Sequence, residues 1–120
     1  MQKKILIVED DSDFQDIYQL YLQGESFQVL TALNGKEAMA VLEKETPDLI
    51  ILDLIMPVMD GEEFYVQLRA QEKWRPIPVI IASVNDKMPQ GIIDLGGVAW
   101  SLKKPFAVDV LIEKIREKLK

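Results

Sequence analysis

The sequence predicts an α/β fold in which a parallel sheet is covered by helices on both faces. Four short apolar runs lead to this prediction: residues 5–8, 49–52, 79–82 and 98–102. The first three contain only Ile, Leu, Val and Ala, which is typical of strands that are buried on both faces. Helical patterns lie between the runs, and right-handed crossover connections then favour a doubly wound sheet.

The first helix is predicted over residues 12–23, because apolar side chains recur there at helical spacing. Ser12 and Gln15 have the spacing of a capping box at its start, and Gly24 is expected to end it. The apolar positions are Phe14, Ile17, Tyr18, Tyr21 and Leu22.

The remaining elements alternate between strand and helix, so that a strand–helix unit is expected five times. Turn residues and breaks in the apolar pattern set their limits. They are a strand over 27–32, a helix capped by Asn34 and Glu37, a loop over 54–61 with turn signals at Pro57 and Asp60, a helix over 62–72, a weak helix over 86–97 that contains Pro89 and Gly91, and a last helix over 108–119.

Length and composition predict one globular domain and exclude several classes of site. The chain has 120 residues, of which 48% are hydrophobic and 28% charged. It has no cysteine, which is compatible with a reducing cytoplasm, and no histidine, so a metal ion would need oxygen ligands. The net charge of −6 argues against non-specific nucleic-acid binding. No apolar segment approaches the roughly 18 residues of a membrane-spanning helix.

Polar side chains follow the predicted strands at the point where each strand ends. Glu9, Asp10 and Asp53 follow two of the runs, Ser83 follows a third, and Lys104 comes after the last. The carboxyl ends of parallel strands share one edge of the sheet, which is where such folds place their sites. Three carboxylates repel one another unless a cation lies among them, and Mg²⁺ is suited to such oxygen ligands.

These groups fit phosphoryl transfer to a carboxylate. No glycine-rich phosphate loop of the G-x-x-x-x-G-K or G-x-G-x-x-G type is present. Asp53 can be the nucleophile, while Ser83 and Lys104 can supply a hydroxyl and a cation to the phosphoryl oxygens.

The order and spacing of these motifs resemble the receiver domain of bacterial two-component response regulators, over essentially all of residues 1–120. The matching pieces are the apolar run into Glu9 and Asp10, the stretch from Asp53 to Gly61, Ser83, and Lys104 with Pro105 and Phe106. The resemblance implies a flavodoxin-like sheet of five parallel strands in the order 2-1-3-4-5, with five helices. It also implies a cytoplasmic signalling domain, not an enzyme, whose output partner the residues do not name.

The same resemblance assigns roles within the site. Asp53 would accept a phosphoryl group from the phosphohistidine of a sensor histidine kinase or a phosphotransfer protein. Glu9, Asp10, Asp53 and the main-chain carbonyl of Ile55 would form the Mg²⁺ pocket. Ser83 would be the switch hydroxyl, and Lys104 would contact the phosphoryl group and precede a cis peptide bond to Pro105.

Two positions depart from the family pattern. Val84 follows Ser83 where the family has a small residue, and Ser101 occupies the place of a common aromatic switch residue. Trp100 is adjacent to Ser101, but the alternation of a strand would point it to the other face of the sheet. These departures put the usual coupling between the switch hydroxyl and an aromatic side chain in doubt.

Two other functions remain open from the sequence. The chain could be a degenerate receiver that acts only as a protein-interaction module, and Mg²⁺-dependent labelling by a phosphodonor would separate that case. It could also be an aspartyl-phosphate phosphohydrolase or phosphotransferase. An enzyme of the haloacid-dehalogenase type would have a second aspartate two residues after Asp53, where this chain has Ile55.

Overall fold

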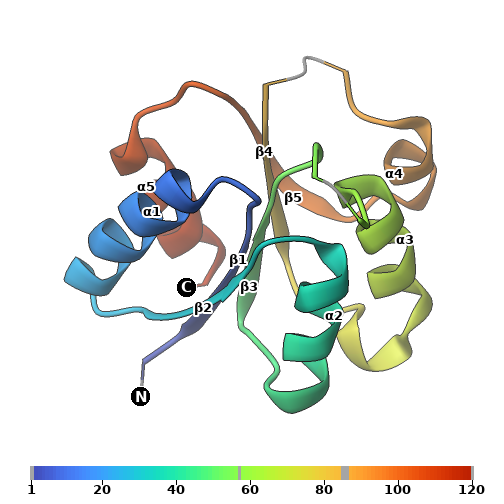
Figure 1. The fold of residues 1–120 in the computed structure, drawn as a ribbon, viewed down its shortest axis with the longest axis horizontal. Helices are drawn as coiled ribbons and strands as arrows, with labels where there is room; N and C mark the ends of the chain where they lie inside the picture. Colours follow the sequence, from blue (N-terminus) through green and yellow to red (C-terminus); the bar gives the residue numbers. More distant parts are fainter. Residues whose placement is uncertain (1, 57, 85–86, 120) are drawn as a thin grey trace.

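The computed structural model describes residues 2–56, 58–84 and 87–119, and it confirms the predicted α/β architecture (Figure 1). The predicted turn signal at Pro57 and the predicted helix start at residue 86 lie outside the described residues. In chain order the elements are β1 (Lys4–Val8), α1 (Ser12–Gly24), β2 (Gln28–Ala32), α2 (Gly35–Lys44), β3 (Leu49–Leu52), α3 (Gly61–Ala70), a 3₁₀ turn η1 (Glu72–Trp74), β4 (Val79–Ser83), α4 (Gln90–Leu95), β5 (Val98–Lys103) and α5 (Val108–Lys118).

The described strands form one parallel sheet in the order β2-β1-β3-β4-β5, as predicted. In its register, Val8 of β1 pairs with Leu52 of β3, and Leu52 pairs with Ile81 of β4. Helices α1 and α5 cover one face of the sheet, while α2, α3 and α4 cover the other (Figure 1). Every strand therefore ends at the same edge, which becomes the place for a site.

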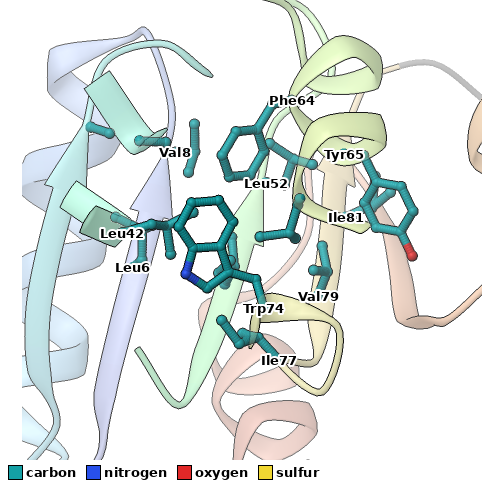
Figure 2. Close-up of a cluster of buried hydrophobic side chains, with 14 of the residues drawn as sticks. Leu6, Val8, Leu42, Leu52, Phe64, Tyr65, Trp74, Ile77, Val79 and Ile81 are labelled. Atoms are coloured by element: carbon teal, nitrogen blue, oxygen red, sulfur yellow. The ribbon is translucent and has the colours of Figure 1, made fainter. Parts of the chain in front are cut away.

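Two apolar cores lie on the two faces of the sheet. Leu49 and Ile51 of β3 belong to the core under α1 and α5, whereas Ile50 and Leu52 belong to the core under α2 and α3. Trp74 lies at the centre of the second core (Figure 2). Because alternate residues of one strand enter different cores, the strand needs apolar residues at every position.

Helix α1 begins as predicted, but its cap differs from the prediction. Asp11, not Ser12, is the N-cap, and its Oδ1 accepts hydrogen bonds from the main-chain N–H groups of Asp13 at 2.9 Å and Phe14 at 3.3 Å. The predicted capping box is therefore wrong. Because Asp11 is the cap, Gln15 is the fourth helical residue, one position beyond the third residue that a capping box uses.

The buried stripe of α1 is narrower than the predicted one. Tyr18 and Leu22 are buried, but Phe14 is 41% exposed, and Ile17 and Tyr21 are also exposed. Buried Gln15 takes the place on the inward face that these apolar residues do not fill. One face of α1 therefore carries apolar side chains that the sheet does not cover.

The other helix boundaries follow the sequence signals with small shifts. The Asn34 side chain caps α2 as predicted, accepting a hydrogen bond from the Glu37 N–H at 2.9 Å. Helix α3 has Asp60 as its cap and ends two residues earlier than predicted, because the η1 turn follows it. Helix α4 covers only Gln90–Leu95 of the segment predicted over 86–97, and Pro89, which was expected inside the helix, is its N-cap. None of the described helices has the length and apolar content that a membrane span requires.

The two faces of β5 separate Trp100 from Ser101, as the alternation predicts. Trp100 pairs with Ile80 of the α1 and α5 face, and Ser101 pairs with Ile81 of the opposite face. The Lys114 ammonium of α5 lies 3.7 Å from the centroid of the Trp100 ring. Trp100 therefore packs toward α5 and does not substitute for an aromatic residue at position 101.

Candidate functional site

The acidic residues meet because β1 and β3 are neighbours that end together. Glu9 and Asp53 directly follow the register pair Val8 and Leu52. The Asp53 N–H donates to the Val8 carbonyl at 2.9 Å, which extends the ladder to the site. Carboxylate oxygens of Glu9, Asp10 and Asp53 all lie within 4.8 Å of one another. The predicted convergence of these three residues is confirmed.

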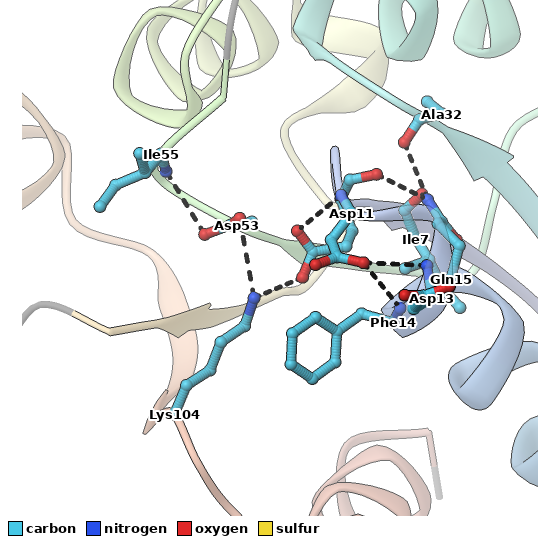
Figure 3. A network of polar contacts seen from close by, with 10 residues as sticks. Ile7, Asp11, Asp13, Phe14, Gln15, Ala32, Asp53, Ile55 and Lys104 are labelled. Atoms are coloured by element: carbon cyan, nitrogen blue, oxygen red, sulfur yellow. Dashed lines mark hydrogen bonds and ion pairs between the residues drawn. The ribbon is translucent and has the colours of Figure 1, made fainter.

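Lys104, the residue that follows β5, reaches the same group. The main-chain N–H of Lys104 donates to the Ser83 carbonyl at 2.8 Å, which fixes the main chain of Lys104 next to the end of β4. Its ammonium pairs with Glu9 Oε1 and lies 3.7 Å from Asp53 Oδ2 (Figure 3). The Lys104 side chain is only 10% exposed, so water screens these charges little. The predicted cis peptide bond between Lys104 and Pro105 is present.

Neighbouring charges shift the pKa values of the pocket's carboxyl groups in opposite directions. Burial raises the pKa of the Glu9 carboxyl, neighbouring Asp53 raises it further, and Lys104 acts in the opposite direction. Burial and the nearby Glu9 carboxyl also raise the pKa of Asp10. Both shifts show that negative charge accumulates here at a cost, so additional positive charge would be favourable.

The chemistry of the donor set fits a hard divalent cation. Three carboxylates offer oxygen ligands close together, and neither cysteine nor histidine occurs in the chain. Mg²⁺ is bound by one or two carboxylates together with water and phosphate oxygens. Ile55 lines the cavity beside these groups, while the role of its carbonyl stays a prediction.

Helix α3 begins against the Asp53 peptide. The Gly61 N–H donates to the Leu54 carbonyl at 3.0 Å. A β-carbon at residue 61 would collide with the Asp53 carbonyl oxygen and would lie 2.5 Å from the Leu54 α-carbon. The Asp53 side chain is held from the same loop, because its Oδ1 accepts a hydrogen bond from the Ile55 N–H at 3.3 Å.

A cavity of about 420 Å³ opens onto Asp53. Its walls include Val84, which is 57% exposed and so stands at the entrance, as expected for a bulky residue at this position. Ser83 is buried at the end of β4 and is not among the residues that line the cavity. The role of Ser83 as a switch hydroxyl stays a prediction.

Gln15 belongs to the support of the site, and its role was not predicted. Its side-chain amide donates to the carbonyls of Ile7 at 3.0 Å, Glu9 at 3.2 Å and Ala32 at 2.9 Å (Figure 3). These contacts join α1 to the ends of β1 and β2 directly beneath the acidic group. A signal was available, since Gln15 is in helical phase with Tyr18 and Leu22 and so falls on the buried face.

Comparisons with known proteins agree with this architecture. The family model of the response regulator receiver domain matches residues 5–116. The alkaline phosphatase synthesis transcriptional regulatory protein PhoP of Bacillus subtilis is 36% identical over 107 residues, which cover 89% of this chain and 44% of PhoP. This chain spans about half the length of the curated relatives it matches.

Solved structures of similar fold cover nearly all of the chain. The chemotaxis response regulator CheY4 of Vibrio cholerae has a TM-score of 0.90 at 30% identity, covering 99% of this chain and 100% of that chain. TrrA of Thermotoga maritima, solved with Mg²⁺ and BeF, has a TM-score of 0.86 at 28% identity, covering 98% and 100%. Because the family model matches most of the chain, this protein belongs to the response regulator receiver domains, the signalling domains of two-component systems.

Proposed function

We propose that this domain is a Mg²⁺-dependent phosphoacceptor switch in two-component or phosphorelay signalling, with Asp53 as the acceptor. The convergence of Glu9, Asp10 and Asp53 within 4.8 Å, next to the Lys104 ammonium, carries the proposal. An acceptor carboxylate needs a reachable oxygen and nearby positive charge, and this pocket supplies both. A receiver that acts only as an interaction module would not need such a pocket.

The proposed step transfers a phosphoryl group between two proteins. A carboxylate oxygen of Asp53 attacks the phosphorus atom of a phosphohistidine on a sensor histidine kinase or a phosphotransfer protein. A P–O bond forms as the P–N bond breaks, and the electron pair of the P–N bond returns to the imidazole nitrogen of the partner. This chain has no histidine of its own, which fits a phosphohistidine supplied by another protein.

Residues around Asp53 would bind the oxygens of the transferred group. Lys104 Nζ, at 3.7 Å from Asp53 Oδ2, is placed to contact one of them, and Ser83 would offer its hydroxyl to another. Glu9, Asp10, Asp53 and the Ile55 carbonyl would hold Mg²⁺. When bound, Mg²⁺ supplies positive charge that offsets the charge of the phosphoryl oxygens. The complex of TrrA with Mg²⁺ and BeF supports this choice of ion.

The extent of the domain, its cellular location and the class of its partners are part of the same proposal. Residues 1–120 would form one receiver domain that works in the cytoplasm. Its partners would be proteins, because a net charge of −6 disfavours contact with nucleic acid through this domain.

Incubation with acetyl phosphate and Mg²⁺ tests the acceptor. Intact-mass spectrometry should detect one added phosphoryl group, and both Asp53→Asn and removal of Mg²⁺ by a chelator should abolish it. Asp60→Asn is the matched control, since Asp60 lies in the same loop and asparagine also caps a helix. Labelling of Asp53→Asn at the parental level would refute the assignment, and no labelling of the parent would favour the interaction module.

A further inference from the structure

We propose that Phe14 is a positioning residue for phosphoryl transfer, because its ring face holds the Lys104 ammonium toward Asp53. This inference rests on the proposed function, since Lys104 is the cation that would bind the transferred group. Lys104 Nζ lies 4.7 Å from the centroid of the Phe14 ring, which is within the range of a cation–π interaction. Figure 3 shows the ring beside the end of the Lys104 side chain, toward α1.

Within the described part of the chain, three groups lie close to the ammonium. Glu9 Oε1 and Asp53 Oδ2 lie on the sides that face the pocket, and the Phe14 ring lies on another. The ring attracts the charge through its negative face and does not require one N–H to point along a fixed direction. It can therefore retain the cation near Asp53 while leaving N–H donors available to a phosphoryl oxygen.

The Phe14 ring has support although it is 41% exposed. It stacks on Tyr18, one helical turn further along α1, with ring centroids 6.2 Å apart. Tyr18 is buried and stacks in turn on Phe106, at 6.4 Å between centroids. A single exposed ring on a helix surface is mobile, whereas this ring rests on a buried partner and faces a charge.

The expected consequence is a slower transfer of the phosphoryl group. Without the ring, one side of the ammonium meets water, and the Lys104 side chain occupies other rotamers more often. Fewer molecules then present the cation to the phosphoryl group at the moment of transfer.

Fluorination of the ring separates its charge distribution from its shape. Phe14 would be replaced by 4-fluoro-, 3,5-difluoro- and 3,4,5-trifluorophenylalanine, which weaken the negative ring face step by step. At saturating acetyl phosphate, the labelling rate of Asp53 should fall in that order, by about threefold to tenfold across the series. The same substitutions at Phe27, a buried ring that takes no part in this stack and has no cation over it among the described residues, are the matched control and should leave the rate unchanged.

A measurement on the unphosphorylated protein tests the contact itself. Ring currents should shift the Lys104 Cε protons upfield in the parent, and Phe14→Leu should return them to ordinary values while Phe14→Tyr retains the shift. A flat fluorination series, or ordinary Lys104 shifts in the parent, would overturn the role of Phe14. A parent that shows the shift but is not labelled would instead overturn the proposed function.

Discussion

Helices α4 and α5 flank the same end of the sheet on opposite faces, but different forces hold them. Helix α5 has eleven residues and buries Leu111, Ile112 and Ile115 against the strands. Of the six residues of α4, all described, only Ile92 is buried. Helix α5 is therefore part of an apolar core, whereas α4 needs other contacts to stay in place.

Side chains of α3 supply those contacts to α4. Glu62 Oε2 accepts a hydrogen bond from the Gly91 N–H at 3.1 Å. At the other end of α4, the Tyr65 hydroxyl donates to the Gly96 carbonyl at 2.5 Å and Arg69 Nη2 donates to the Gly97 carbonyl at 3.1 Å. The three donors and acceptors of α3 follow helical spacing, so one face of α3 holds both ends of α4.

This difference indicates that α4 can change position at a lower free-energy cost than α5. Hydrogen bonds near the surface contribute about 0.5–1.5 kcal/mol each, because water replaces them when they break. Apolar burial is lost only when the core opens. Helix α4 therefore belongs to the low-stability part of the domain, and its position depends on α3, which itself begins against Asp53.

A matched pair of isoleucine substitutions gives the largest expected effect. Ile115 of α5 and Ile92 of α4 are both fully buried. Ile115→Ala should lower the free energy of unfolding by about 2–5 kcal/mol. Ile92→Ala should cost less, because α4 can detach from the domain before the full cost is reached. Urea denaturation measures both values, and equal losses would show that α4 is as firmly held as α5.

Removal of the Arg69 side chain should have the next largest effect. Besides Gly97, Arg69 donates to the carbonyls of Arg75 and Ile77, each at 2.9 Å, so one guanidinium joins α3 to two loops. We expect Arg69→Met to destabilise the domain by about 1–3 kcal/mol and to speed amide exchange in α4 more than in α5. Arg75→Met, which removes a single side-chain hydrogen bond, is the control and should cost less than half as much.

Gly91→Ala tests the Glu62 contact on a smaller scale. Alanine should stabilise a helix by about 0.4–1 kcal/mol relative to glycine. Here its β-carbon would lie 2.8 Å from Glu62 Oε2, so the side chain of Glu62 must move away. The gain should therefore appear only in the Glu62→Ala background. A full gain from Gly91→Ala alone, measured by denaturation in a double-mutant cycle, would mean that Glu62 contributes nothing to α4.

The smallest effect is the change in hydrogen exchange that we expect when beryllofluoride, a phosphoryl mimic, binds to the site. Because Ser101 replaces an aromatic residue, Ser83 has no large side chain to draw inward behind it. Hydrogen exchange should then change most in the described residues between Val84 and Gly97, because α4 in this segment buries only Ile92. Unchanged exchange in this segment, together with a response around Ser101 and in α5, would contradict the prediction.

The sequence alone predicted the sheet well because its strands are short and uniformly apolar. The run at residues 49–52 coincides with β3, and the run at 5–8 differs from β1 by one residue. The acidic site was predictable for the same reason, since strand ends determine which carboxylates meet. The cap of α1 was missed because Asp11 and Ser12 are adjacent and both are good caps.

The missed contacts join residues that are distant in sequence. The bonds of Gln15 to three carbonyls, the ring of Phe14 on Lys104 and the bonds from α3 to α4 all depend on how helices pack on the sheet. Periodicity shows which face of a helix is buried, but it does not show which polar atom meets which. Those contacts could be recognised only once the packing was known.

Gly61 gives a rule for anyone who would engineer this domain. No side chain stands between the start of α3 and the Asp53 carbonyl, and even a methyl group would force the two apart. Position 61 should therefore tolerate replacement poorly in a mutational library, although it contributes no side chain to the pocket. A loop transplanted into another protein would have to carry Asp53 and Gly61 together, because the glycine sets how closely the helix can approach the acceptor.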